Sequence, residues 1–201
     1  MRLILVRHAE TDWNHEFRVQ GQADLPLSEL GKKQTELIAM RLKDVSVDAI
    51  ISSPLRRALE TAKAINRFHD VGIETSDGLK ELDTGEIDGL LLTEIGSVHP
   101  DFYRVWVNDA ASARIPGGES LPELQERVWG SIQSILKRTH LGTVVVVSHF
   151  FALITLLCKV MDISLSDMRR LSMAVGSISI LDVLGERIRL TVFGDACHLE
   201  V

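Results

Sequence analysis

Short apolar runs alternate along the chain with longer segments in which apolar residues recur at helical spacing. The short runs, rich in leucine, isoleucine and valine, predict buried strands. The expected strands cover residues 2–6, 49–51, 73–75, 144–147, 177–183 and 187–193. The third is expected at a sheet edge, the fourth is expected to be buried on both faces, and the last two form a closing pair around Gly185 and Glu186.

The longer segments predict helices, and several of them begin with a recognisable start signal. Ser28 and Ser120 are of the type that caps a helix N-terminus, and Pro54 lies where a proline is tolerated in the first turn. The expected helices cover residues 29–43, 54–68, 120–138 and 152–161. Residues 7–27 are expected to form a long loop, and residues 81–118 an irregular segment with one short helix near 102–107.

The alternation of strands and helices predicts an α/β protein, in which a mostly parallel sheet lies between two helical layers. A single domain over residues 1–201 is expected, because this length suffices for one good core. Ligands of such sheets bind beyond the carboxyl ends of the strands. Three of the expected strands end there in polar pairs, which are Arg7-His8, Ser52-Ser53 and Ser148-His149.

The composition is that of an ordinary globular protein, with 45% hydrophobic and 25% charged residues. A net charge of -6 argues against a nucleic-acid coat and against binding to an acidic membrane surface. Two cysteines, Cys158 and Cys197, provide no disulfide framework, and the opening MRLILV is too short for a secretory signal. A reduced, cytoplasmic protein is therefore expected.

One segment, residues 143–161, is apolar enough to imitate a membrane span. It changes character in the middle, from four valines to a segment of alanine, leucine and isoleucine. That change favours a strand followed by a helix, so no span is expected.

The first candidate chemistry lies at Arg7 and His8. A lone histidine after a strand is more often structural than catalytic, but Arg7 is adjacent and a second histidine, His149, ends another strand. Guanidinium groups bind phosphate oxygens in a bidentate way. Nearby cations also disfavour the imidazolium, so His8 is expected to be neutral and able to attack phosphorus. The same cluster with Glu81 imitates a metal site, but paired arginines make a metal ion unfavourable there, and none is expected.

Six segments together resemble the histidine phosphatase superfamily, the phosphoglycerate mutase-like group. They are LVRHAETDWN (5–14), RVQGQADLPLSELGKKQ (18–34), SSPLRRALETA (52–62), LKELDTGEIDG (79–89), PGGES (116–120) and VVVVSHF (144–150). They follow the order of the family and span almost the whole chain. The resemblance implies a three-layer α/β/α sandwich and a phosphohistidine mechanism that needs neither metal nor cofactor.

The resemblance also implies a role for each matching residue. His8 is the nucleophile, Glu81 protonates the leaving oxygen and later activates water, and Arg7, Arg57 and His149 stabilise the phosphoryl oxygens. The remaining expected contacts to substrate are Asn14, Gln20, Gly21 and the backbone N–H of Phe150. Arg18, Gln22 and the loop 83–116 are expected on the leaving-group side, where Phe102, Tyr103 and Trp106 are candidates to cap the leaving group.

Within the family, the resemblance favours a phosphatase over a mutase. The mutases carry a longer insertion before the last histidine, and a Gly-Trp pair where this chain has Gln20-Gly21-Gln22. A cofactor-dependent mutase and a member that binds phosphorylated ligands without turnover stay open. The expected partner is a small phosphorylated metabolite, and similar phosphatases act on phosphoserine, α-ribazole phosphate, phosphoglycerates, sugar phosphates or many esters at once.

Several features outside the shared motifs bear on the substrate and on the surroundings of the site. Asp83 and Thr84 stand where the phosphoserine-specific type has a histidine shortly after the acid, which puts phosphoserine in doubt. The tail around Cys197 and His198 resembles that of small phosphatases in which it approaches the site. Outside the motifs, His15, His69, His99 and His140 are interpreted as surface or loop histidines. The sequence leaves the oligomeric state open, a homodimer included.

Overall fold

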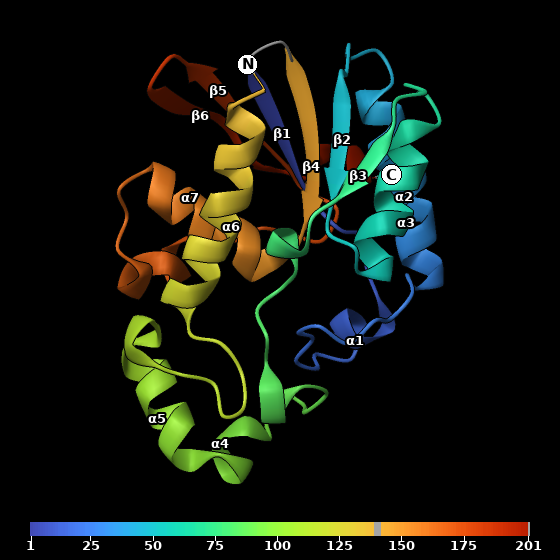
Figure 1. Cartoon of the computed structure of the whole chain (residues 1–201). Helices are drawn as coiled ribbons and strands as arrows, with labels where there is room; N and C mark the ends of the chain where they lie inside the picture. Colours follow the sequence, from blue (N-terminus) through green and yellow to red (C-terminus); the bar gives the residue numbers. More distant parts are fainter. Residues whose placement is uncertain (139–141, 201) are drawn as a thin grey trace.

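A computed structural model describes residues 1–138 and 142–200 and contains one six-stranded sheet (Figure 1). Its strands are β1 (Arg2–Arg7), β2 (Ala49–Ser52), β3 (Ile73–Thr75), β4 (Thr143–Ser148), β5 (Ile178–Leu184) and β6 (Arg187–Asp195). Their order across the sheet is β3-β2-β4-β1-β5-β6. The first four in that order are parallel, and β5 and β6 are antiparallel to their neighbours.

Helices cover both faces of the sheet and give the expected three layers. One layer holds α2 (Glu29–Leu42) and α3 (Arg56–Asn66), and the other holds α6 (Leu121–Leu136) and α7 (Phe150–Val160) (Figure 1). Because successive side chains of a strand point to opposite faces, β4 supplies Val144 and Val146 to one core cluster and Val145 and Val147 to the other. The predicted fold class is therefore confirmed.

Capping residues fix where the long helices begin. The Ser28 hydroxyl accepts from the backbone N–H of Gly31, and Ser120 forms a reciprocal capping box with Glu123. The helix expected from Pro54 begins later, at Arg56, and the helix expected from residue 152 begins at Phe150. This last shift matters because it places the N-terminus of α7 directly after His149.

The irregular segments contain three short helices, one of which the sequence predicts. Residues 7–27 include α1 (Asp12–His15), and residues 81–118 include α4 (Ile95–Val98) and α5 (Pro100–Asn108), which confirms the short helix expected near 102–107. The 3-10 helices are Asp77–Leu79, Gly85–Ile87, Ala110–Ser112, Leu165–Arg170 and Cys197–Leu199. In Figure 1, α1, α4 and α5 lie beyond the carboxyl ends of the parallel strands, where a ligand site is expected.

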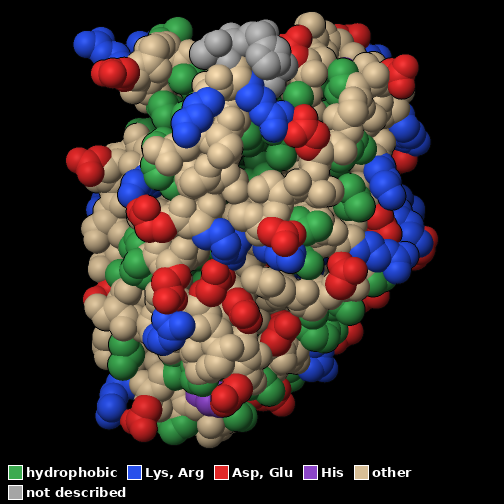
Figure 2. All heavy atoms as spheres, viewed as in Figure 1, with side chains coloured by type: hydrophobic (Ala, Val, Ile, Leu, Met, Phe, Trp, Pro, Cys, Tyr) green, Lys and Arg blue, Asp and Glu red, His purple; other side chains and the backbone are tan. Residues whose placement is uncertain are grey.

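The segment 143–161 forms β4 and α7, as its change of composition predicts. Among the described residues, no helix is long and apolar enough to cross a membrane. Cys158 is buried and Cys197 is exposed, and both are free thiols. Acidic and basic side chains are interspersed over the described residues of the face shown in Figure 2. His140 lies outside the described residues.

Candidate active site

Three strand ends bring the predicted polar pairs together at one edge of the sheet. The register of β1 on β4 places Arg7 opposite Ser148, and the His8 backbone N–H donates to the Ser148 carbonyl over 2.9 Å. The Ser53 backbone N–H donates in the same way to Val147, also over 2.9 Å. As a result, the rings of His8 and His149 lie 5.0 Å apart, centroid to centroid.

His8 is held in one tautomer and in its neutral form. Its Nδ1 lies 2.7 Å from the carbonyl oxygen of Ala9, which only accepts, so Nδ1 carries the proton and Nε2 carries a free lone pair. The side chain is 3% exposed. Burial lowers the pKa of His8 well below its usual value, and the charges of Arg57 and Arg7 lower it further. The expected neutral state agrees with this, although burial rather than charge is the larger cause.

His149 is fully buried beside His8. Its Nε2 lies 2.7 Å from the Ser53 hydroxyl, and its Nδ1 is buried without a protein partner. Burial lowers the pKa of His149 well below its usual value, with further lowering by the charges of Arg57 and Arg7. A buried ring nitrogen without a partner costs free energy, so a ligand that bonds to Nδ1 would be favoured.

Arg7 and Arg57 retain their charge near neutral pH although burial lowers the pKa of each guanidinium to about 10. Arg7 donates from Nη1 to the Met173 carbonyl over 2.5 Å and lies over the Phe150 ring at 5.0 Å. Arg57 donates to the carbonyls of Ala23 and Gly21 over 2.8 and 2.7 Å. The Nε of each guanidinium is buried without a partner.

Glu81 lies at the N-terminus of α7, where its carboxylate replaces water as the acceptor for backbone donors. Its Oε1 accepts from Leu82 and Ala152 over 2.8 and 3.2 Å, and its Oε2 accepts from Phe151 over 3.1 Å. Burial raises the pKa of Glu81, and this outweighs the lowering by those hydrogen bonds and by the charges of Arg57 and Arg7. The group therefore combines a fixed position with an increased affinity for a proton.

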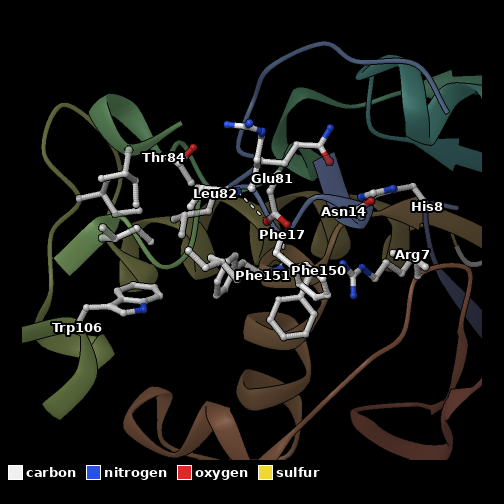
Figure 3. Close-up of a pocket in the computed structure, with 18 of the residues that line it drawn as sticks. Arg7, His8, Asn14, Phe17, Glu81, Leu82, Thr84, Trp106, Phe150 and Phe151 are labelled. Atoms are coloured by element: carbon white, nitrogen blue, oxygen red, sulfur yellow. Dashed lines mark hydrogen bonds between the residues drawn. The ribbon is translucent and has the colours of Figure 1, made fainter. Parts of the chain in front are cut away.

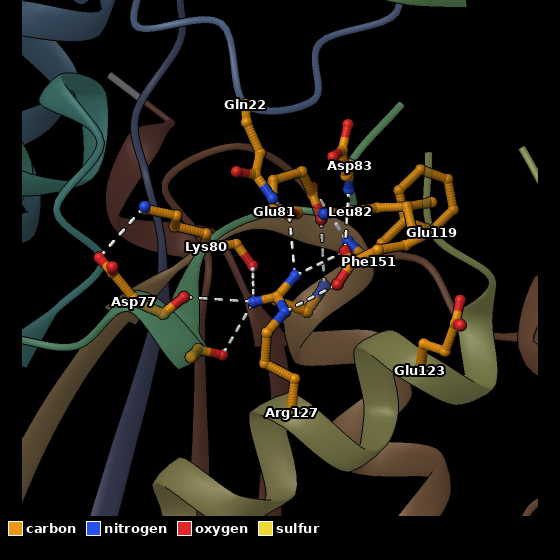
Figure 4. A network of polar contacts seen from close by, with 12 residues as sticks. Gln22, Asp77, Lys80, Glu81, Leu82, Asp83, Glu119, Glu123, Arg127 and Phe151 are labelled. Carbon is orange, nitrogen blue, oxygen red and sulfur yellow. Dashed lines mark hydrogen bonds and ion pairs between the residues drawn. The ribbon is translucent and has the colours of Figure 1, made fainter. Parts of the chain in front are cut away.

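The backbone that carries Glu81 is held by an ion pair that the sequence reasoning missed (Figure 4). Arg127 of α6 donates to the carbonyls of Gly78, Lys80 and Glu81, each over 3.1 Å. Its Nε and Nη2 also donate to the two carboxylate oxygens of Glu119, over 2.9 and 2.7 Å. Glu119 belongs to the quoted PGGES segment, whereas nothing in the sequence around Arg127 marks it, because the carbonyls that it binds lie 46 or more residues away.

A cavity of about 410 Å³ opens beside these groups (Figure 3). Arg7 and His8 lie at one end and Trp106 at the other, with Glu81, Phe150 and Phe151 between them. Asn14 and Gln20 also line the cavity. The Oδ1 of Asn14 accepts from the backbone N–H and hydroxyl of Thr11, so its amide nitrogen is the group left to donate. Gln20 has a buried amide nitrogen without a partner.

Several predicted site residues lie outside the cavity lining. His149 and Arg57 are buried behind it, and Gly21 supports the site from its backbone. A Cβ on Gly21 would lie 2.1 Å from the Thr84 hydroxyl, so only glycine permits this close approach. Gln22 donates to the Glu81 carbonyl over 3.2 Å rather than lining the cavity.

Of the residues predicted on the leaving-group side, some line the cavity and others do not. Phe102 and Trp106 line the cavity, and Tyr103 does not. Arg18 lines it with its guanidinium already bound to Glu16 and to the Gly89 carbonyl. None of the described residues of the C-terminal tail lines the cavity, and Nε2 of His198 lies 3.1 Å from the Gly176 carbonyl. No group of three or more potential metal ligands is found among the described residues.

Known proteins resemble this chain over almost its whole length. Phosphoserine phosphatase 1 of Hydrogenobacter thermophilus is 36% identical over 99% of this chain and 94% of its own. A probable phosphoglycerate mutase GpmB of Salmonella choleraesuis is 34% identical over all of this chain and 95% of its own. The solved structure of Bacillus stearothermophilus YhfR superposes with a TM-score of 0.94 at 32% identity, over 99% of both chains.

The family comparison agrees with these relatives and with the motifs. The Histidine phosphatase superfamily (branch 1) matches residues 3–196, which include every strand and both helical layers. The chain belongs to the histidine phosphatase superfamily, branch 1.

Proposed function

We propose that this histidine phosphatase hydrolyses a small phosphomonoester, without a metal ion or cofactor, through a phosphoryl group carried by His8. The observation that carries the proposal is the state of two buried groups beside one cavity. His8 is neutral with its Nε2 lone pair free, and Glu81 has a raised pKa. A nucleophile and an acid of this kind are what transfer of a phosphoryl group from an alcohol requires.

In the first half of the reaction, Nε2 of His8 attacks phosphorus and the bond from phosphorus to the ester oxygen breaks. Protonated Glu81 gives its proton to that oxygen, so the alcohol leaves as a neutral molecule. In the second half, Glu81 as the carboxylate takes a proton from water, and the oxygen of that water attacks phosphorus. The P–N bond breaks, its electron pair returns to Nε2, and inorganic phosphate leaves.

The remaining site residues act on charge and position. Arg7, Arg57 and His149 stabilise the negative charge that the phosphoryl oxygens carry through both steps, which is the main source of catalysis in phosphoryl transfer. Asn14 and Gln20 donate from their amide nitrogens, and the Phe150 N–H donates from the first turn of α7. Gly21 keeps its segment close to Thr84, and its carbonyl orients Arg57.

A mutase is the second candidate, because a relative of 34% identity is named a probable phosphoglycerate mutase. The two activities differ in what receives the phosphoryl group, water or a second hydroxyl of the substrate. With 3-phosphoglycerate, a phosphatase releases as much inorganic phosphate as ester consumed, whereas a mutase produces 2-phosphoglycerate. A ligand-binding member without turnover would do neither.

The sharpest test of the mechanism replaces Glu81 with glutamine, which preserves size but not proton transfer. General acid–base catalysis is worth about 10²–10⁴-fold, so Glu81→Gln should lower kcat for an alkyl phosphate by that factor. An acidic phenol needs little protonation to leave, so p-nitrophenyl phosphate should still phosphorylate the enzyme. Slow water attack then limits turnover, and a burst of phenol equal to the enzyme concentration is expected.

The intermediate itself provides the control. Alkaline quenching of the Glu81→Gln variant should preserve an acid-labile phosphoryl group on His8, located by mass spectrometry. His8→Ala should abolish both the burst and the label, whereas His69→Ala, at a histidine outside the cavity, should change neither. A full burst from the His8→Ala variant would show that another group is the nucleophile.

A further inference from the structure

Four aromatic rings form a continuous wall that begins at Arg7. Its guanidinium lies over Phe150, whose ring packs on Phe151 at 5.1 Å; Phe151 packs on Trp106 at 5.8 Å, and Trp106 on Phe102 at 5.7 Å. All four line the cavity and are called the aromatic row below. The row leads from the proposed phosphate end toward the far end of the cavity (Figure 3).

The rim of the same cavity carries two exposed apolar side chains, Phe17 and Leu92, which are 72% and 53% exposed. The Leu92 backbone N–H donates to the Phe17 carbonyl over 3.0 Å, which ties the two segments together. Phe17 follows the end of α1 with φ of 57°, in the left-handed region that usually holds glycine or asparagine. An exposed phenylalanine in the left-handed region is unfavourable on both grounds, which suggests that the ring of Phe17 has a functional role.

The space between the row and the rim is apolar. Most of its other lining side chains are apolar, namely Val19, Leu82, Ile87, Ile95, Ile115 and Val175, and Thr84 adds one hydroxyl. Among the described residues, Arg18 is the one cationic side chain that lines the cavity besides Arg7, and its guanidinium is occupied by Glu16 and Gly89. Glu10 and Glu81 add negative charge. A carboxylate placed between these walls would lose water and be repelled by these two acids, with only the Thr84 hydroxyl and the Gln20 amide nitrogen available to donate to it, whereas an apolar ring would gain contact.

We propose that the cavity selects monoesters of apolar, ring-bearing alcohols over esters whose alcohol carries a carboxylate, and that Phe17 determines this selectivity by covering the ring. This rests on the proposed function, because it concerns the alcohol that the same site releases. The phosphoryl group lies at Arg7 and His8, and the ring lies between the aromatic row and Phe17. Phe17 is a specificity residue, since it contacts the alcohol and not the reacting atoms.

The test compares kcat/KM for esters of aliphatic alcohols, so that the leaving oxygens are of one chemical type. The panel is 2-phenylethyl phosphate, glycerol phosphate, phosphoserine and 3-phosphoglycerate. The phenylethyl ester should exceed glycerol phosphate by about tenfold or more, which is the discrimination that hydrophobic pockets achieve. Both should exceed the two carboxylated esters.

Variants then assign the selectivity to Phe17. Phe17→Asn suits the left-handed backbone but removes the ring, so the ratio of phenylethyl to glycerol phosphate should fall about tenfold. Phe17→Tyr retains the ring and should preserve the ratio. Phe68→Asn is the matched control, because Phe68 is exposed and lies outside the cavity, and it should leave the ratio unchanged. Thermal melting of each variant confirms folding.

The outcomes separate this inference from the proposed function. If the wild type hydrolyses none of the esters, the proposed function fails. If it hydrolyses phosphoserine or 3-phosphoglycerate better than the phenylethyl ester, the function stands and the selectivity is wrong. An unchanged ratio in a folded Phe17→Asn variant would refute the role of Phe17.

Discussion

Burial acts in opposite directions on the two groups that would move the phosphoryl group and the proton. It lowers the pKa of His8 and raises the pKa of Glu81, since in each case it disfavours the charged form. One apolar environment therefore prepares a neutral nucleophile and a protonated acid. Exclusion from water is the largest cause of both pKa shifts.

These shifts predict a pH dependence with a definite sign. The neutral form of His8 persists to pH values well below 6.5, so its titration should not limit kcat/KM near neutral pH. The acid form of Glu81 is lost as pH rises through its raised pKa, so kcat/KM for an alkyl phosphate should fall on the alkaline side. The pH dependence of kcat/KM is measured for the wild type and for Glu81→Gln with the same ester. Titration of the substrate affects both proteins equally, so the difference between them isolates the alkaline decrease that is due to Glu81. A limb that persists in the variant would assign the titration to another group.

At the scale of elements, the position of Glu81 depends on two separate devices. The N-terminus of α7 binds its carboxylate, and Arg127 of α6 binds the backbone around it. Arg127 in turn is oriented by Glu119, so α6, α7 and the PGGES segment meet at one acid. Arg127 does not line this cavity, so its expected role is to position the backbone of Glu81.

Replacement of Arg127 by lysine tests that role. A single ammonium cannot reproduce the planar fork that reaches four carbonyls and Glu119, so Glu81 should lose its fixed position. A misplacement of about 1 Å costs about 10²-fold, so kcat for an alkyl phosphate should fall far more than the burst rate with p-nitrophenyl phosphate. Arg138→Lys, at an exposed ion pair with Glu74, is the matched control. Equal losses with both esters would indicate a general loss of structure.

The apolar pattern predicted all six strands and the four long helices, because each buries a face whose periodicity is visible in the sequence. It missed α1, a four-residue helix held by the capping of Thr11 and Asn14 rather than by apolar periodicity. It placed the start of α7 two residues late, because Phe150 and Phe151 favour a helix less than the alanine and leucines that follow. Because of that small error, the sequence did not show that the backbone N–H groups of Phe151 and Ala152 lie in the first turn of α7, where they bind the Glu81 carboxylate.

At the scale of the whole molecule, the sequence predicted which polar residues meet and two residues of the surface that surrounds them, Phe102 and Trp106, but not the rest of that surface. Arg7, His8 and His149 converge because parallel strands end at one edge. The aromatic row combines α5 with α7, and the rim combines residues near α1 with the segment before α4. The apolar periodicity of these segments does not predict the contacts between them, since the contacts depend on how distant loops pack over the sheet.

The charge distribution of the site predicts that activity survives chelation. In the proposed mechanism, two guanidinium groups that retain their charge supply the stabilisation that a divalent ion provides elsewhere. Turnover of p-nitrophenyl phosphate should be unchanged after dialysis against excess EDTA. Loss of activity that one particular divalent ion restores would contradict the metal-free mechanism.

The strand order has a consequence for how the protein is made. β1 lies between β4 and β5, and both of these follow it by most of the chain. During synthesis the apolar segment of β1 therefore leaves the ribosome long before either neighbour exists to pair with it. Because such non-local pairing is slow and leaves unpaired strand edges exposed, the segment that precedes the proposed nucleophile is an expected site for chaperone binding on the nascent chain.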